Sequence, residues 1–272
     1  MASLLIEIAR CVNVPVARAS SNHPCHQVVA AQAVAPHDFH VPEPWSGDLA
    51  SAPILFISSN PALAQASRVG EPDAEYPTAD WDAAVVSDFF THRFGDGQRG
   101  WVVGGNRALL TDGSHGKANA FWSAVKKRAE ELLEREAVPG VDYALTELVH
   151  CKSRGEHGVR EAVSECARLY LTRVLESSGA AVIVALGSIA ADALRTIVNV
   201  SAGRVSEPFV LAQCERIVVL LPHPNARTVR SLTGCLAPEE LDRLVSHLRG
   251  RAGRRSRSAG PLLFSIRDTN GN

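Results

Sequence analysis

The chain has 272 residues, of which 46% are apolar, and its formal net charge is -1. A chain of this length and apolar content can bury a large core, as one large domain or two small ones. The balanced charge excludes a strongly basic or acidic protein, so any nucleic-acid surface must be a local patch. No apolar run reaches transmembrane length, and the N-terminus lacks the basic leader and cleavage site of a signal peptide. We therefore expect a cytoplasmic protein with no membrane partner.

Residues 1–52 have mixed polarity and are expected to form an irregular or short-helical N-terminal extension. This segment contains Cys11 and Cys25, two of the six cysteines of the chain. In a cytoplasmic protein, cysteines are more often free thiols, metal ligands or cluster ligands than disulfides. His23, Cys25 and His26 lie close enough in sequence to be zinc ligands as one alternative.

Four apolar runs rich in β-branched residues follow at wide spacing, at 54–58, 143–149, 181–186 and 217–221. Short continuous runs of this kind are typical of parallel strands that are buried on both faces. Helical patterns occupy the segments 119–135, 161–176, 188–198 and 238–249, the last with Gly250 as a stop signal. The alternation predicts an α/β fold, a three-layer α/β/α sandwich around a central, mainly parallel four-stranded sheet.

Two segments interrupt or follow this pattern. Residues 63–118 are charged, carry several aromatic residues and have little periodicity, so we expect a partly helical insertion over the site. Residues 250–272 place several arginines among serine and glycine, which is typical of a disordered basic tail, although such a tail could also contact phosphates. The predicted organisation is an N-terminal extension over 1–52, an α/β domain over 53–249 and a basic tail over 250–272.

The loops after the four predicted strands should share one edge of the sheet, because ligands of parallel sheets bind outside the carboxyl ends of the strands. The first loop, SSNPA at 58–62, offers Asn60, and the loop after the last strand offers His223 and Asn225. A carboxamide that faces an imidazole could position a water molecule and stabilise a leaving anion. Asparagine and histidine before proline are also common in turns, so these residues alone indicate only a polar site at the sheet edge.

The order of the motifs resembles the uracil-DNA glycosylase superfamily. SSNPA follows the first strand, where that superfamily has motifs such as G-I-N-P-G, and HPN at 223–225 follows the last strand, where it has H-P-S. Between them, TELVHCKS at 146–153, SECARLYL at 164–171 and AAVIVALGSIAADAL at 180–194 are similar to the iron–sulfur branch of the superfamily. The resemblance covers about residues 53–232 and rests on the ordered set, since no single motif is specific.

The resemblance implies a monomeric, monofunctional DNA glycosylase of base excision repair, a hydrolase that flips a deaminated base such as uracil out of DNA. Asn60 is similar to the asparagine that positions the attacking water. His223 is similar to the histidine that hydrogen-bonds the base carbonyl and steadies the leaving anion. The loop from Asn225 would enter the duplex, with Arg227 and Arg230 near phosphates. As alternatives to these catalytic roles, Asn60 is only a turn residue and His223 is only a buried or turn histidine.

The chain departs from the family pattern at several positions. Ser58 and Ala62 replace glycines, and Asn225 replaces a serine. Glu147 stands where the family has a base-reading asparagine, and an ionised glutamate accepts hydrogen bonds but does not donate them. Four explanations are open: the register is shifted, Glu147 is protonated, the preferred base is not uracil, or activity has been lost. Alternatively, Glu147 forms a structural salt bridge.

Because Glu147 departs from the family pattern, two other functions stay open. One is a non-catalytic nucleic-acid or nucleobase binding module on the same fold, and another is a hydrolase of free nucleosides. For base binding, Tyr76 has the spacing of the family's stacking aromatic residue, with Phe89 and Phe90 as alternatives, and Ser59 is assigned to the same role beside Glu147.

The resemblance also implies ligands for an iron–sulfur cluster. Cys151 and Cys166 match the two downstream cluster cysteines of the branch, whereas Cys11 and Cys25 stand much further apart than its upstream C-x-x-C. Together these four thiolates could hold a four-iron cluster. Alternatively, Cys151 and Cys166 are small buried apolar residues and the other two are unrelated to them.

Overall fold

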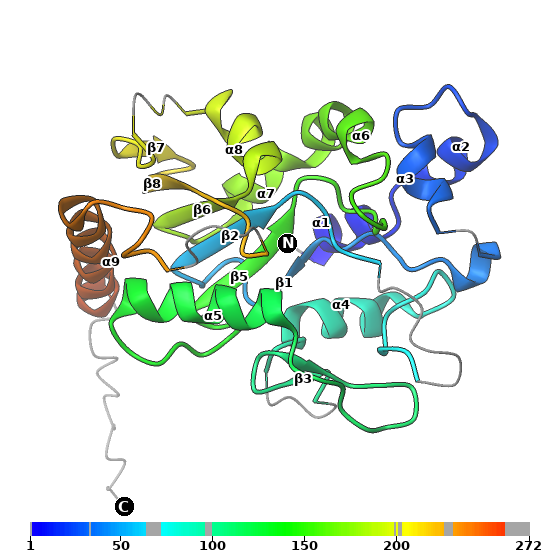
Figure 1. Cartoon of the computed structure of the whole chain (residues 1–272), viewed down its shortest axis with the longest axis horizontal. Coiled ribbons are helices and arrows are strands. Elements are labelled where there is room, and N and C mark those ends of the chain that lie inside the picture. The colour runs from blue at the N-terminus through cyan, green and yellow to red at the C-terminus, as the bar shows by residue number, and fades with distance from the viewer. Residues whose placement is uncertain are drawn as a thin grey trace, which may run out of the picture.

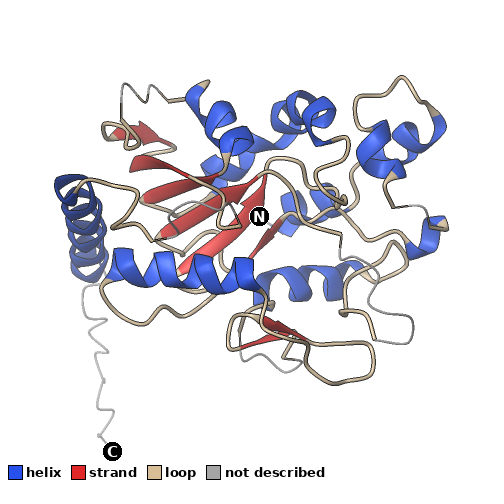
Figure 2. Ribbon diagram, in the orientation of Figure 1, coloured by secondary structure: helices blue, strands red, loops and turns tan. Residues whose placement is uncertain are grey.

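The computed structural model describes residues 2–32, 34–63, 72–95, 100–198, 200, 203–225 and 231–258. A twisted sheet runs through the middle of the molecule, and helices cover both of its faces (Figures 1 and 2). The three-layer α/β/α sandwich expected from the sequence is therefore confirmed. Within these described ranges, no helix is both long enough and apolar enough to cross a membrane.

In the described part of the chain, the main sheet has six strands in the order β1-β5-β2-β6-β8-β7. The strands are β1 (Trp45–Ser46), β2 (Ile54–Ser58), β5 (Tyr143–Glu147), β6 (Val182–Leu186), β7 (Phe209–Leu211) and β8 (Cys214–Leu221). The four central strands are parallel, as predicted. The predicted count of four strands is wrong, because β1 and β7 add an antiparallel strand at each edge. With two and three residues, β1 and β7 are too short for a hydrophobic period to be recognised in the sequence.

The central strands alternate their side chains between two apolar layers, as strand geometry requires. In β2, Leu55 and Ile57 join one buried cluster, whereas Ile54 and Phe56 join the other. Every residue of β2, β5 and β6 is buried. Continuous apolar runs therefore predicted these strands correctly, because both faces of the sheet are covered.

The helices divide between the two faces. Their bounds are α1 (Ala2–Ala9), α2 (Asn13–Ala19), α3 (His26–Ala30), α4 (Ala83–His92), α5 (Ala120–Leu133), α6 (Val159–Cys166), a π-helical segment (Ala167–Leu171), α7 (Thr172–Ser177), α8 (Ser188–Arg195) and α9 (Pro238–Ser258), with a short 3-10 turn at Pro36–Asp38. Residues of α5 and α9 pack in the cluster that contains Phe56. Residues of α1, α4, α7 and α8 pack in the cluster that contains Leu55.

The C-terminal helix is longer than predicted. The stop expected at Gly250 does not occur, and α9 continues to Ser258. No neighbouring atom lies within 4 Å of the place a Cβ would take at Gly250, so this glycine has no packing role. A glycine inside a helix costs only about 1 kcal/mol relative to alanine, and the residues after it include good helix formers. The rest of the predicted tail, 259–272, lies outside the described residues.

The segment before residue 53 is short-helical, as expected, and it packs into the core. Leu5 and Ile8 of α1 and Trp45 of β1 are almost fully buried in the same cluster as Leu55. The predicted insertion, 63–118, contains α4 and a two-stranded hairpin of β3 (Val102–Val103) and β4 (Arg107–Ala108). Both segments therefore lie against the sheet that carries the predicted site.

Candidate active site at the carboxyl edge of the sheet

The loops after β2 and β5 remain paired beyond the ends of their strands. Leu148 N donates to Ser58 O at 3.0 Å, and Ser153 N donates to Pro61 O at 3.2 Å. Ser58 stands opposite Glu147 in the parallel register. Because the two loops run side by side, Asn60 is held against the residues that follow β5.

The amide of Asn60 is oriented by this pairing. Its Nδ2 donates to Pro61 O at 2.9 Å, to Ser153 Oγ at 3.0 Å and to Cys151 O at 3.5 Å. The acceptors are oxygens, so they identify the nitrogen end of the amide. None of the described residues donates a hydrogen bond to Asn60 Oδ1. The carbonyl end of the amide is therefore available to a water molecule or a substrate.

His223 follows β8 and is held as a neutral donor. Its Nδ1 accepts a hydrogen bond from Asn225 N at 3.2 Å, which places the ring proton on Nε2. The ring stacks on Phe121, with centroids 5.4 Å apart and planes 21° apart. Burial lowers the pKa of His223 below its ordinary value of 6.5, so the imidazole is neutral at pH 7. Arg128 Nη1 donates to Pro222 O at 3.1 Å and so holds the residue immediately before His223.

These side chains line one cavity of about 330 Å³. Four of the predicted site residues meet there: Asn60, Glu147, His223 and Asn225. They come from the end of β5 and from the loops after β2 and β8, which confirms the expected shared edge of the sheet. The start of α5 closes the cavity with Phe121 and Trp122.

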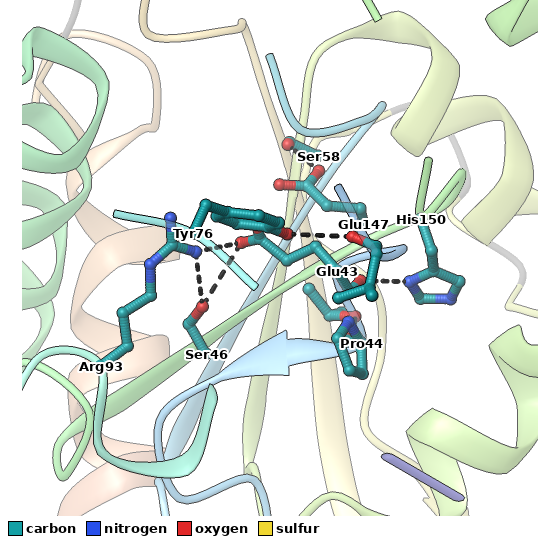
Figure 3. A network of polar contacts seen from close by, with 10 residues as sticks. Glu43, Pro44, Ser46, Ser58, Tyr76, Arg93, Glu147 and His150 are labelled. Carbon is teal, nitrogen blue, oxygen red and sulfur yellow. Dashed lines mark hydrogen bonds and ion pairs between the residues drawn. The ribbon is translucent and has the colours of Figure 1, made fainter. Parts of the chain in front are cut away.

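Glu147 lines the cavity as the last residue of β5 and is only 7% exposed. The Ser58 hydroxyl donates to its Oε2 (Figure 3). Burial, together with the nearby charge of Glu43, raises the pKa of Glu147 well above 4.5, which favours the protonated carboxyl. No described cation forms a salt bridge with it. Because a protonated carboxyl both donates and accepts, Glu147 has the hydrogen-bonding capacity of the amide expected at this position.

A second buried carboxyl, Glu43, stands on the same wall and is ionised. Its Oε1 pairs with Arg93 Nη1 at 2.7 Å, and its Oε2 accepts from the Tyr76 hydroxyl at 3.2 Å (Figure 3). Burial raises the pKa of Glu43, but the charges of Arg93 and Lys152 and the hydrogen bonds outweigh it and hold that pKa below 4.5. His150 fixes the backbone of this residue, since His150 Nδ1 lies 2.7 Å from Glu43 O.

Two residues assigned to base binding, Tyr76 and Ser59, are not among the described residues that line the cavity. Tyr76 bonds Glu43 and packs edge-on against Phe89 and Phe90, so all three rings belong to the apolar core. Ser59 donates to Glu156. The aromatic side chains on the cavity wall are Phe121 and Trp122, whose backbone nitrogens bond the Asn119 cap of α5. The helix pattern predicted a helix from residue 119, but periodicity alone does not show which rings face the cavity.

Three charged residues of the cavity were not assigned from sequence: Glu43, Arg93 and Lys152. They come from three segments far apart in the chain, so no spacing connects them. The predicted DNA-binding residues Arg227 and Arg230 lie outside the described residues.

Four cysteines meet at a second, small enclosed cavity of about 20 Å³. They are Cys11, Cys25, Cys151 and Cys166. Burial raises the pKa of Cys151, and the other three thiols raise it further. The three thiols are therefore close enough to Cys151 for their charges to interact with it. Tyr170 donates its hydroxyl to Cys11 Sγ at 3.2 Å.

The approach of α3 to α6 helps to assemble these cysteines. Gly158 has φ +72°, and a Cβ there would lie 2.4 Å from Val28 N, so only glycine allows this contact. Among the described residues, no three His, Cys, Asp or Glu side chains are grouped to hold a single metal ion. His26 Nδ1 instead lies 2.7 Å from Ala17 O, within hydrogen-bonding distance.

The fold and the site together define the class of protein: an α/β sandwich with an asparagine and a neutral histidine at the carboxyl edge of its parallel sheet. The family model of the uracil DNA glycosylase superfamily matches residues 44–249. The chain therefore belongs to that superfamily, as the order of its motifs indicated. A search of curated proteins returned no match.

Proposed function

We propose that this protein is a monofunctional DNA glycosylase that hydrolyses the N-glycosidic bond of a flipped, deaminated base such as uracil. The observation that carries the proposal is that Asn60 and the neutral His223 line one cavity of about 330 Å³. A cavity of this size accommodates a nucleobase. Membership of the superfamily supports the same conclusion.

The proposed reaction assigns each residue one task. Cleavage separates a cationic sugar from an anionic base, so the site must steady the base and present a water molecule. His223 donates from Nε2 to a carbonyl oxygen of the base, and a neutral ring suffices for that. Asn60 Oδ1 accepts from the attacking water and aims it at the sugar. Water is nucleophilic enough, because an oxocarbenium-like sugar accepts a weak nucleophile.

The base is held by the walls beside these two residues. We assign contacts with the flipped base to Phe121 and Trp122, and contacts with the base edge to the Glu147 carboxyl, since all three line the cavity. Asn225 lies at the exposed side of the cavity, where the duplex would approach. We assign DNA contacts to Asn225 and to Arg227 and Arg230 of the following loop.

The activity is tested with labelled duplexes that carry uracil, hypoxanthine, xanthine or ethenocytosine. After incubation and alkali treatment, strand cleavage is expected on at least one duplex and on none with normal bases. An Asn60→Ala protein serves as the matched control, because it lacks the water-positioning oxygen. Absence of cleavage on every duplex would refute glycosylase activity. Saturable binding without turnover would instead support a non-catalytic binding module.

We also propose that Cys11, Cys25, Cys151 and Cys166 hold a four-iron cluster. The donor set supports this, since four cysteine thiolates are the usual ligands of such clusters. The surrounding walls are apolar, with Val28, Val149 and Leu169 among the lining residues. When bound, the cluster would join the N-terminal segment to α6 and to the loop after β5. It lies outside the cavity of Asn60 and His223, so we give it a structural role.

Anaerobic purification tests the cluster. The wild-type protein is expected to be brown, with about four iron and four sulfide per chain. A Cys151→Ser variant is expected to lose most of this iron, whereas Cys214→Ser should retain it, because Cys214 lies outside the cluster cavity. A colourless wild-type preparation without iron would rule the proposal out.

A further inference from the structure

Lys152 is a buried lysine on the wall of the active-site cavity, and the reaction described above does not use it. It is 9% exposed and lines the cavity with Asn60, Glu147 and His223. None of the described residues accepts a hydrogen bond from Lys152 Nζ. The ammonium lies 3.2 Å from the centroid of the Tyr76 ring, which covers one side of it. Its other hydrogen-bonding directions have no protein partner in the described ranges.

The two carboxyls on the same wall are already occupied. Glu43 bonds Arg93, Ser46 and Tyr76. Glu147 accepts from Ser58. Neither carboxyl forms a salt bridge with Lys152 within the described residues. A lysine is rarely buried without an acceptor, because its donors lose their water molecules on burial. The acceptor that Lys152 lacks is therefore expected from whatever fills the cavity.

The position of Lys152 indicates which part of a ligand it would meet. His223 follows β8, whereas Lys152 follows β5 and lies close to residues near β1. The strand order places β2 and β6 between β5 and β8. A base whose carbonyl is bound by His223 would therefore present its opposite edge to Glu147 and Lys152.

We propose that Lys152 is a specificity-determining residue of this cavity, which donates a hydrogen bond from Nζ to a carbonyl oxygen on the base edge remote from His223. The proposal rests on the proposed function and narrows its substrate class. The expected substrates carry a second carbonyl oxygen at the position of O4 of uracil, besides the carbonyl that His223 binds. An exocyclic amino group there would meet donors and be rejected.

The protonation states on this wall agree with a donor role. Both the ammonium and the neutral amine carry N–H donors, so the role does not depend on a single protonation state. Glu147 lies on the same wall, and its Oε2 already accepts from the Ser58 hydroxyl.

The test compares substrates that differ only in the remote carbonyl. Duplexes carry uracil or pyrimidin-2-one, which lacks O4 and keeps the carbonyl O2. kcat/KM is measured for the wild type, for Lys152→Met, which keeps the chain length without a donor, and for Lys126→Met as a lysine control outside the cavity. For Lys152→Met we expect a loss of about 10- to 100-fold on uracil, the usual effect of one hydrogen bond to a charged group. We expect little change on the base without O4.

The outcomes separate this proposal from the proposed function. If Lys152→Met slows both members of the pair equally, or neither, a role in base reading is overturned. If the wild type cleaves no duplex, glycosylase activity fails, and equilibrium binding of the same pair decides the role of Lys152. A preference for uracil that disappears in Lys152→Met supports the proposal, and equal affinities overturn it. Thermal melting of each variant identifies any loss caused by misfolding.

Discussion

Replacing His223 with alanine is expected to lower the rate of base release about 10²- to 10³-fold, the usual effect of removing one donor from a developing anion. The ring is held by the Asn225 backbone and by stacking on Phe121, so its Nε2–H is oriented before substrate binds. Single-turnover cleavage of the preferred duplex measures the chemical step directly. Since the loss is in the transition state, kcat should fall more than KM rises.

Two variants show whether that loss is specific. His223→Gln keeps a donor near the same place and should recover part of the rate. His92→Ala removes an exposed histidine outside the cavity and should leave the rate unchanged. His223 would be only a turn residue if His223→Ala retained the wild-type rate while the protein remained folded.

Replacing Arg93 with methionine is expected to destabilise the fold by about 3–5 kcal/mol, the usual effect of removing one partner of a buried ion pair. Both partners are buried, with side chains 8% and 9% exposed, and the change leaves the Glu43 carboxylate without its cation. Arg93 also lies over the rings of Tyr76, Phe89 and Trp122, and methionine preserves some of that packing. Urea unfolding followed by circular dichroism measures the free energy of unfolding.

The loss in free energy of unfolding caused by Arg93→Met should depend on pH in a defined direction. In the wild type, the pKa of Glu43 is held below 4.5, so the ion pair stabilises the fold above that pH and is lost as pH falls through the lower folded value. Without Arg93, the folded pKa of Glu43 rises, and the cost of its charge is present only above pH 4.5. The difference between the two proteins should therefore shrink in acid.

Two controls accompany this experiment. Arg93→Met combined with Glu43→Gln removes the charge as well as its partner and should recover part of the stability. Arg195→Met breaks the exposed pair with Asp192 and should cost about 0–1 kcal/mol. Equal stability of Arg93→Met and the wild type at pH 7 would show that the pair does not hold this wall together.

The sequence by itself determined the central sheet and the location of the site. Continuous apolar runs identify strands buried on both faces, and the polar residues that end them must lie at one edge because the strands are parallel. That reasoning placed Asn60, Glu147 and His223 together before any contact was known, and they line one cavity. The resemblance to the iron–sulfur branch, and not the sheet pattern, brought together Cys11, Cys25, Cys151 and Cys166, which line a second cavity.

Only the tertiary structure decided which other side chains complete the site. Tyr76 and Phe121 are both aromatic residues near the site, but Tyr76 packs behind the wall and Phe121 stacks on His223. Glu43 and Arg93 meet across a separation of 50 residues, and no local pattern records such a partner. Periodicity reports how deeply a residue is buried, whereas the protonation of Glu147 depends on which charges surround it. The chemistry of this wall therefore follows from packing between segments that are distant in the chain.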